Sequence, residues 1–359
     1  MPATTGGRST IEDVARLARV SRTTVSNFLN GRDARMNDET RLRIRSAMDA
    51  LSYVPLASAR QLRTGHAEII GVIVPSVANP FWGEFVRAAE EGALAAGFGV
   101  LVGSSERLAE RERTHAEAMY RQGIRAVIFG SSPLSIGHIV PLAERGLSVV
   151  AFDREFHGGD IPNIEWATVD NRLGARLATG HLLELGHRRI GFLSGPIRTA
   201  SRRDRLDGYR DALGAAGLSF DGSLVWEGSQ SSAFGDDEGA ALGALGARQL
   251  AELPEPPTAL VCINDMYAIG AMTGLEHAGL SVPDDVSVIG FDDIPLASYT
   301  RPALTTIRQP VAAMARAAVD VLIRRLRAEP PPTDFRHVYE PELVVRASTS
   351  PTHPHQELE

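Results

Sequence analysis

Polar side chains between Ser9 and Asn30 have types and spacing suited to reading DNA bases. The apolar residues of this stretch predict two short helices joined by a tight turn. Arg22, Thr23 and Asn27 lie near the start of the second helix and away from its apolar side. Arg can bond two acceptors of guanine, Asn can pair with adenine, and Thr can touch the methyl group of thymine. We therefore predict a helix-turn-helix whose second helix enters the major groove. An ordinary amphipathic helix pair is the alternative that periodicity alone leaves open.

Capping residues set the expected boundaries of these helices. Thr10 can cap the first helix, with Asp13 in the reciprocal position three residues later, and Ser21 can cap the second. Asn37 is expected to cap a third helix that runs through Leu51. The apolar faces are expected to hold Val14, Leu17 and Ala18, then Val25, Phe28 and Leu29, and then Ile44, Ala47, Met48 and Leu51. So small a bundle has only a marginal core of its own.

From Ala67 onward the chain alternates between apolar strands and helical stretches. The expected strands are 69–75, 99–103, 126–130, 148–152, 189–194, 259–263 and 286–291, and the expected helices are 85–96, 111–122, 141–145, 173–186, 204–216 and 267–278. Repeated strand–helix units form a parallel sheet with helices on both faces. We predict an α/β fold of two doubly wound lobes, with ligand sites outside the carboxyl ends of the strands.

Charge separates the N-terminal stretch from the rest of the 359-residue chain. Residues 1–65 hold 11 Arg and 6 acidic residues, a net charge of +5, so the remainder of a chain of net charge −7 carries −12. A basic head on an acidic body fits DNA binding by the head alone. No apolar run approaches the ~20 residues of a membrane span, and the N-terminus has no hydrophobic signal segment. With a single cysteine, Cys262, these features predict a cytoplasmic, nucleoid-associated protein.

Several polar residues stand where a ligand would bind, just after predicted strands or at the start of a helix. Asp153 can accept hydrogen bonds from ligand hydroxyls, or it can serve as a helix cap or ion-pair partner. Arg205 has a planar fork that can hold two ligand oxygens. Asn264 offers both a donor and an acceptor, while Asp265 is expected to cap the next helix. This chemistry suits a polar, polyhydroxylated ligand.

Phe81 and Trp82 are the aromatic pair nearest to an expected strand end. Their rings can offer a flat apolar face to a sugar or a base. Packing within the lobe or at a dimer interface is the alternative role. We expect one of the two to face the ligand.

The stretch IEDVARLARVSRTTVSNFLNG, followed by Tyr53-Val54-Pro55, resembles the DNA-binding headpiece of the lactose-repressor (LacI/GalR) family of bacterial regulators. The resemblance continues through the whole chain. It implies a core like that of periplasmic binding proteins, with a ligand between the lobes. It also implies a hinge helix that folds on operator DNA, where Leu62 would wedge between base pairs in the minor groove. Leu56 departs from the pattern, because the family often has Asn directly after the Pro.

The resemblance also implies which residues contact each ligand. For the effector these are Asn79, Phe81, Trp82, Asp153, Arg205, Asn264, Asp292 and Gln309. For DNA they are Thr10, Ser21, Arg22, Thr23, Thr24, Ser26, Asn27, Asn30, Tyr53, Ala59 and Leu62. Asp170 and Asn171 match a further family motif and are expected to serve the structure of the lobes. Asp293 is expected to be structural as well.

These features predict a transcription regulator, usually a repressor in this family, that binds a palindromic operator as a dimer. A small polar ligand, a sugar or sugar derivative, is expected in the cleft between the lobes, with no cofactor, no metal and no enzymatic activity. The expected parts are a helix-turn-helix domain (1–52), a hinge (53–66) and a ligand-binding and dimerisation core (67–359). The core lobes are expected at about 67–165 with 309–331 and about 166–308 with 332–350.

Other functions fit parts of the sequence. A purine or nucleoside, or a protein co-regulator, is the alternative effector. A solute-binding protein for transport fits the core, but the helix-turn-helix argues against it. An enzyme would show a phosphate loop, a GxSxG nucleophile elbow or a cluster of metal ligands, and the sequence has none of these motifs. The C-terminal tail lacks the leucine heptads of a tetramerising coil, which favours a dimer.

Overall fold

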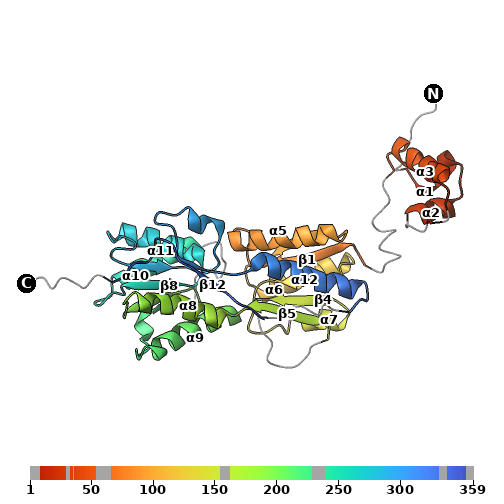
Figure 1. The fold of residues 1–359 in the computed structure, drawn as a ribbon. Coiled ribbons are helices and arrows are strands. Elements are labelled where there is room, and N and C mark those ends of the chain that lie inside the picture. Colours follow the sequence, from red (N-terminus) through yellow and green to blue (C-terminus); the bar gives the residue numbers. More distant parts are fainter. Residues whose placement is uncertain are drawn as a thin grey trace, which may run out of the picture. The chain divides into compact units, whose positions relative to one another are not determined.

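The chain divides into two compact units, Met1–Ala67 and Glu68–Glu359, which are described separately (Figure 1). The computed structural model describes residues 9–29, 33–34, 36–53, 66–153, 162–228, 239–330 and 338–352. Within these ranges no helix is both long enough and apolar enough to cross a membrane.

The N-terminal unit contains the three helices α1 (Ile11–Ala18), α2 (Arg22–Leu29) and α3 (Asp38–Ala50). Thr10 caps α1 and exchanges hydrogen bonds with Asp13, as predicted. The chain then turns at Arg19, whose φ of 54° is left-handed. The backbone N–H of Thr24 donates to Ser21 Oγ over 3.0 Å at the start of α2. The helix-turn-helix geometry therefore follows from local capping and one sharp turn.

The small core of this unit joins all three helices. Val14, Val25 and Ile44 are fully buried in it. The expectation that Leu17 belongs to this core is wrong, because its side chain is 52% exposed. Successive residues of a helix are rotated by about 100° about its axis. Because Ala18 lies on the inner face, Leu17 lies outside that face.

A six-stranded parallel sheet forms the first lobe of the C-terminal unit, in the order β11-β5-β4-β3-β1-β2. Its strands are β1 (Ile69–Val74), β2 (Gly99–Ser104), β3 (Ala126–Phe129), β4 (Ser148–Phe152), β5 (Ile164–Val169) and β11 (Val338–Tyr339). Its helices are α5 (Pro80–Ala95), α6 (Ala109–Arg121), α7 (Val140–Glu144) and α12 (Val311–Leu326). Helix α5 packs beside α12, and right-handed crossovers place α6 and α7 on the opposite face. The continuous apolar run of β1 is explained by this double covering.

A four-stranded parallel sheet forms the second lobe, in the order β7-β6-β8-β9. Its strands are β6 (Ile190–Leu193), β7 (Val225–Trp226), β8 (Ala259–Cys262) and β9 (Ser287–Ile289). Its helices are α8 (Asn171–Glu184), α9 (Ala200–Ala215), α10 (Gly239–Ala251) and α11 (Asp265–His277), with short 3-10 helices η1 (Gly222–Leu224) and η2 (Pro295–Ser298). Figure 1 shows the pair α10 and α11 on one side of β8 and the pair α8 and α9 on the other. The predicted mixed α/β fold is confirmed.

Three segments connect the lobes, two of them later than the sequence suggested. Strand β5 stays in the first sheet through Val169, so the first crossing follows this residue, slightly after the expected position near 166. The second follows β10 (Thr306–Arg308), close to the expected position at 308. The third comes after β11, because this strand still pairs with β5 beyond residue 332. Strand β12 (Glu342–Val344) then pairs antiparallel with β10.

Candidate functional site

The start of α2 presents the polar side chains that the sequence assigned to DNA. Ser21, Arg22, Thr23 and Asn27 are exposed, and Thr24 and Ser26 are half-buried. Arg22 Nη1 lies 3.3 Å from Glu12 Oε1 in an exposed ion pair. Such pairs contribute little to stability, so a phosphate or a guanine edge can replace Glu12 at low cost. The start of α2 thus has the donors and acceptors needed to read a base pair.

Other residues predicted to contact DNA have structural roles or fall outside the described ranges. Thr10 forms the capping box of α1. Tyr53 is half-buried and packs against the core of the N-terminal unit. Asn30, Ala59 and Leu62 lie outside the described residues, so their contacts with DNA stay predictions.

A second candidate site lies at the carboxyl ends of the strands in the C-terminal unit. In each sheet the strand order reverses once, between β1 and β3 and between β6 and β8. Ligands of open α/β sheets bind at such switch points. Asn79 follows β1 and Asn264 follows β8, while Asp153 follows β4 and Asp292 follows β9. The topology therefore collects side chains from distant parts of the chain at one place.

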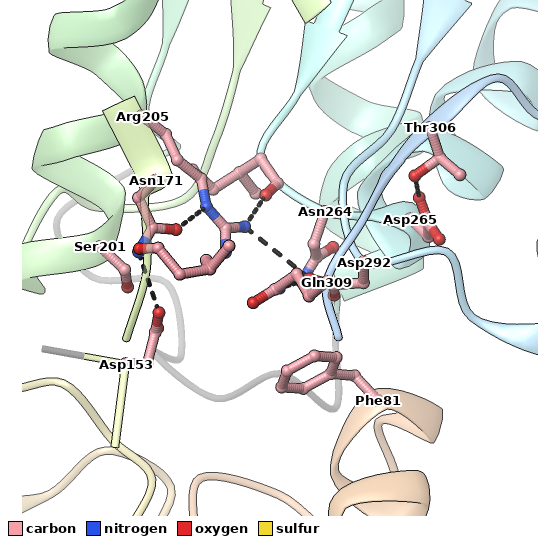
Figure 2. Close-up of polar contacts among 12 residues, drawn as sticks. Phe81, Asp153, Asn171, Ser201, Arg205, Asn264, Asp265, Asp292, Thr306 and Gln309 are labelled. Atoms are coloured by element: carbon pink, nitrogen blue, oxygen red, sulfur yellow. Dashed lines mark hydrogen bonds and ion pairs between the residues drawn. The ribbon is translucent and has the colours of Figure 1, made fainter. Parts of the chain in front are cut away.

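Arg205 is the centre of this site (Figure 2). It lies in the second turn of α9, and its guanidinium is stacked 3.6 Å from the centroid of the Phe291 ring. Its Nε donates to Asn171 Oδ1 over 2.8 Å, and its Nη1 donates to the carbonyl oxygen of Ile263 over 2.5 Å. Nη1 also lies 4.0 Å from Asp292 Oδ1. Burial lowers the pKa of Arg205, because it penalises the charged form.

Asn171 connects Arg205 to the carboxylate of Asp153 in the first lobe. Its Nδ2 donates to Asp153 Oδ1 over 3.0 Å. The sequence assigned Asn171 to lobe structure, but the side chain lies within the polar network of the site (Figure 2). Asp153 itself has a left-handed φ of 60°. Backbone strain of this kind concentrates at functional sites.

Asp292 is buried opposite Arg205 and is held by Gln309. Gln309 Nε2 donates to Asp292 Oδ1 over 2.7 Å, and Gln309 Oε1 is buried without a hydrogen-bond partner among the described residues. Asp292 has a φ of 126°, which an L-residue rarely adopts. Burial raises the pKa of Asp292 well above its usual value, and the charge of Arg205 partly offsets this effect.

Asn264 has the capping role that the sequence suggested for Asp265, and it also lines the cavity at the carboxyl ends of the strands. Asn264 caps α11, because its Oδ1 accepts the N–H of Tyr267 over 3.0 Å. The expectation that Asp265 is the cap is wrong. Asp265 is fully buried and accepts hydrogen bonds from Thr306 Oγ1 and from the N–H of Ile294. Asn79 likewise caps α5 through the N–H of Phe81.

The two aromatic residues of α5 have different surroundings. Trp82 is only 3% exposed and packs edge-on against Phe85 and Phe152 in the core. A Cβ on Gly130 would lie 2.6 Å from the Trp82 ring, so a glycine there makes room for the indole. Phe81 extends from its helix toward the polar network in Figure 2. Of the two rings, that of Phe81 is the better placed to cover a ligand.

A single small cavity brings the predicted effector residues together. All eight line it, and its volume is ≈ 30 Å³. It is also lined by four residues that the sequence did not assign to the ligand: Arg107, Ser201, Arg202 and Ile263. Ser201 and Arg202 lie four and three residues before Arg205, the spacing of one helical face, which is a signal that could have found them. A space of this size holds about one water molecule, so a larger ligand must displace side chains or separate the lobes.

A cavity of ≈ 710 Å³ lies at the opposite, amino-terminal ends of β6, β8 and β9. Leucine and proline side chains provide much of its lining, and none of the predicted effector residues lines it. Arg189, at its edge, is held by the carbonyl oxygen of Glu255 and by Asp221. This lining does not include the hydrogen bonds that link Arg205 to Asn171 and Asp153, so size alone does not make it the candidate site.

A head that presents base-reading side chains and a two-lobed body with a charged polar cavity together define a ligand-controlled DNA-binding regulator. Residues 10–55 match the model for bacterial regulatory proteins of the lacI family, and residues 179–349 match a periplasmic binding protein-like domain. The HTH-type transcriptional regulator GalR of Escherichia coli (strain K12) is 35% identical over 342 residues, which cover 95% of this chain and 96% of GalR. The chain therefore belongs to the lacI family of bacterial regulatory proteins, and it is a transcriptional regulator.

Two solved structures resemble this chain over nearly its whole length. The Lac repressor dimer bound to operator and the anti-inducer ONPF has a TM-score of 0.82 and 28% identity, covering 96% of this chain and 100% of that chain. The complex of the transcriptional regulator CelR with cellobiose has a TM-score of 0.67 and 30% identity, covering 95% and 100%. The predicted resemblance to the lactose-repressor family is confirmed.

Proposed function

We propose that this regulator is a repressor that binds a palindromic operator as a dimer, and that a sugar or sugar derivative in the cleft controls this binding. The observation that carries the proposal is the buried polar network of Asp153, Asn171, Arg205, Asp292 and Gln309 around one cavity. Carboxylates accept hydrogen bonds from hydroxyls, and a guanidinium donates to them. Such a network matches a ligand that carries several hydroxyls in fixed positions.

The relatives support the ligand class and the assembly. CelR is solved with cellobiose, and the Lac repressor is solved as a dimer on operator DNA. A two-fold protein reads a two-fold DNA site. The hinge residues Ala59 and Leu62 are proposed to enter the minor groove, and the protein is proposed to act in the cytoplasm on the nucleoid.

The two lobes are also in contact beside the cavity. This contact suggests how ligand binding changes DNA binding by the N-terminal unit. The N–H groups of Ala200 and Ser201, at the start of α9, donate to the carbonyl oxygen and Oγ of Ser132 over 3.0 and 3.3 Å. Ser132 belongs to the loop after β3 in the first lobe. A ligand too large for the cavity changes the spacing of these elements. Any ligand with different affinity for the two arrangements shifts the equilibrium between them.

A binding-site selection tests the proposal. The full chain is mixed with a pool of random double-stranded DNA, and the bound sequences are read. We expect a palindrome, and we expect its affinity, measured by fluorescence anisotropy, to change when the effector sugar is added. Selection of an asymmetric site by a monomer would contradict the dimer. Control of operator binding by a purine, a nucleoside or a protein, with every sugar inactive, would contradict the ligand class.

A further inference from the structure

The turn between α1 and α2 is closed by an arginine in a conformation that favours glycine. Arg19 has a φ of 54° and a ψ of 49°, which is the left-handed region. Its N–H donates to the carbonyl oxygens of Ala15 and Arg16, and the N–H of Val20 also donates to the oxygen of Ala15. A helix end of this form usually holds Gly or Asn, because a larger side chain crowds the backbone there. The fold therefore requires the backbone conformation at this position, and an arginine makes it harder to adopt.

The guanidinium of Arg19 has no partner among the residues that the structure describes. Its side chain is exposed, and it has no hydrogen bond, ion pair or aromatic contact within those ranges. The arginines three residues to either side differ from it. Arg16 pairs with Asp13. Arg22 pairs with Glu12. A strained residue whose side chain serves no contact in its own chain is typical of a binding surface.

The position of Arg19 in the helix-turn-helix indicates what it binds. It comes two residues before Ser21, whose Oγ accepts the N–H of Thr24 at the start of α2. The start of α2 presents the side chains suited to reading base edges, and the phosphates of the DNA backbone border the groove that such a helix enters. Phosphate oxygens accept strong, charge-assisted hydrogen bonds from a guanidinium. A phosphate beside the groove is therefore the anion that an arginine at this turn is placed to meet.

We propose that Arg19 binds a backbone phosphate of the operator and so fixes the position of α2 in the major groove. The contact carries no base preference of its own. The left-handed backbone of this arginine is unfavourable in the free protein, and the phosphate contact compensates for it on DNA. The inference goes beyond the proposed function, because it concerns the DNA backbone and holds whichever effector controls the protein.

Two measurements on the full chain with Arg19→Gly test this inference, because they are expected to change in opposite directions. Glycine adopts a left-handed φ without strain, so hydrogen exchange of the α1 and α3 amides should slow by roughly threefold or more. Affinity for DNA should nevertheless fall by roughly tenfold at low salt, measured by fluorescence anisotropy. If Arg19 served only the turn, the glycine variant would bind DNA as tightly as the wild type or more tightly, and this result would overturn the inference.

A phosphate contact also predicts how the loss depends on DNA sequence and on salt. Arg19→Gly and Arg19→Gln should weaken binding by the same factor on the selected operator and on a duplex of random sequence. The slope of log affinity against log salt concentration should become shallower by about one for each bound head. Arg19→Lys keeps the positive charge and should retain most of the affinity and of the slope. A loss confined to the operator would make Arg19 a base-reading residue and would overturn the phosphate contact.

The matched control is Arg43→Gln. Arg43 is an exposed arginine of α3 in the same unit, and its guanidinium donates to Thr40 Oγ1 rather than to a carboxylate. This variant is expected to bind DNA nearly as the wild type does. Equal losses in Arg19→Gln and Arg43→Gln would reflect net charge alone and would overturn the contact. Each of these results leaves the proposed effector-controlled repressor standing, since that proposal depends on the selected palindrome and on the ligand.

Discussion

The Nη1 atom of Arg205 lies 4.0 Å from Oδ1 of Asp292, and the two side chains are only 9% and 6% exposed. The pair joins α9 to Asp292, which follows the edge strand β9 of the second lobe. Desolvation of two buried charges offsets much of their attraction. The pair therefore adds little net stability, although removing only one partner would leave the other charge buried and unpaired.

Breaking this pair should cost stability, and neutralising both partners should recover it. Arg205→Gln is expected to destabilise the fold by up to ~3–5 kcal/mol, because Asp292 then stays buried without its partner. The double variant Arg205→Gln, Asp292→Asn is expected to unfold closer to the wild-type free energy, measured by urea titration. A double variant that is as unstable as the sum of the two single variants would show that the residues do not interact.

The unfolding free energy should depend on pH through Asp265. Burial raises the pKa of Asp265 from 3.8 to about 6. A carboxyl with a raised pKa in the folded chain takes up a proton on folding, so its contribution to stability falls as pH rises from about 4 to about 6. Burial also raises the pKa of Asp292, so this carboxyl contributes to the same fall in stability with rising pH.

Asp265→Asn isolates the contribution of this one group. The amide can still accept the N–H of Ile294 and can donate to Thr306 Oγ1, so the fold is preserved. We expect the variant to lose stability less steeply than the wild type between pH 4 and 6, measured by urea unfolding at several pH values. Identical slopes for the two proteins would mean that Asp265 titrates at its ordinary pKa.

Arg22 should contribute to recognition of specific bases. Arg22→Ala is expected to weaken binding to the selected operator by ~1–3 kcal/mol and to change binding to random DNA less. Arg16→Ala is the matched control, because Arg16 is an exposed arginine of the same unit that also pairs with a carboxylate. Equal losses on operator and on random DNA, measured by anisotropy at one salt concentration, would make Arg22 a phosphate contact.

Close packing of α10 against α11 should depend on Gly270. A Cβ at this position would lie 1.9 Å from the carbonyl oxygen of Ala240, a backbone atom that cannot move alone. Gly270→Ala is expected to lower the free energy of unfolding by ~1–3 kcal/mol or more. Gly214→Ala in α9 is the control, because nothing lies within 4 Å of its Cβ. The control should be stabilised by ~0.5–1 kcal/mol, and a similar effect at both positions would contradict the close packing.

Much of the fold could be predicted because local signals agreed with the overall structure. The caps Thr10, Ser21 and Asn37 predicted the N-terminal helices. The apolar runs predicted most strands of the two parallel sheets. Strand β5 was not predicted, because its Glu165 and Trp166 interrupt an apolar run. Strand β11 was not predicted either, because it has two residues and forms through pairing with β5. Such pairing depends on distant parts of the chain and leaves no local pattern.

The candidate site could be predicted where family motifs mark it, and less well elsewhere. The eight residues that the family resemblance assigned to the effector line one cavity. Arg107 was missed because a loop has no periodic pattern from which the direction of a side chain can be predicted. Asp265 was predicted to be a cap because Asp is a common N-cap residue. In the structure Asn264 caps the helix, and Asp265 accepts a hydrogen bond from Thr306.

The most direct test of the account is a thermal-shift screen of the full chain against sugars, sugar phosphates, nucleosides and purines. The folded double variant Arg205→Gln, Asp292→Asn serves as the comparison protein. A ligand at 100 times its dissociation constant should stabilise the wild type by ~2.7 kcal/mol. We predict that a sugar or sugar derivative gives this shift in the wild type and not in the double variant. A ligand that stabilises both proteins equally would bind elsewhere and would contradict the assignment of the cleft.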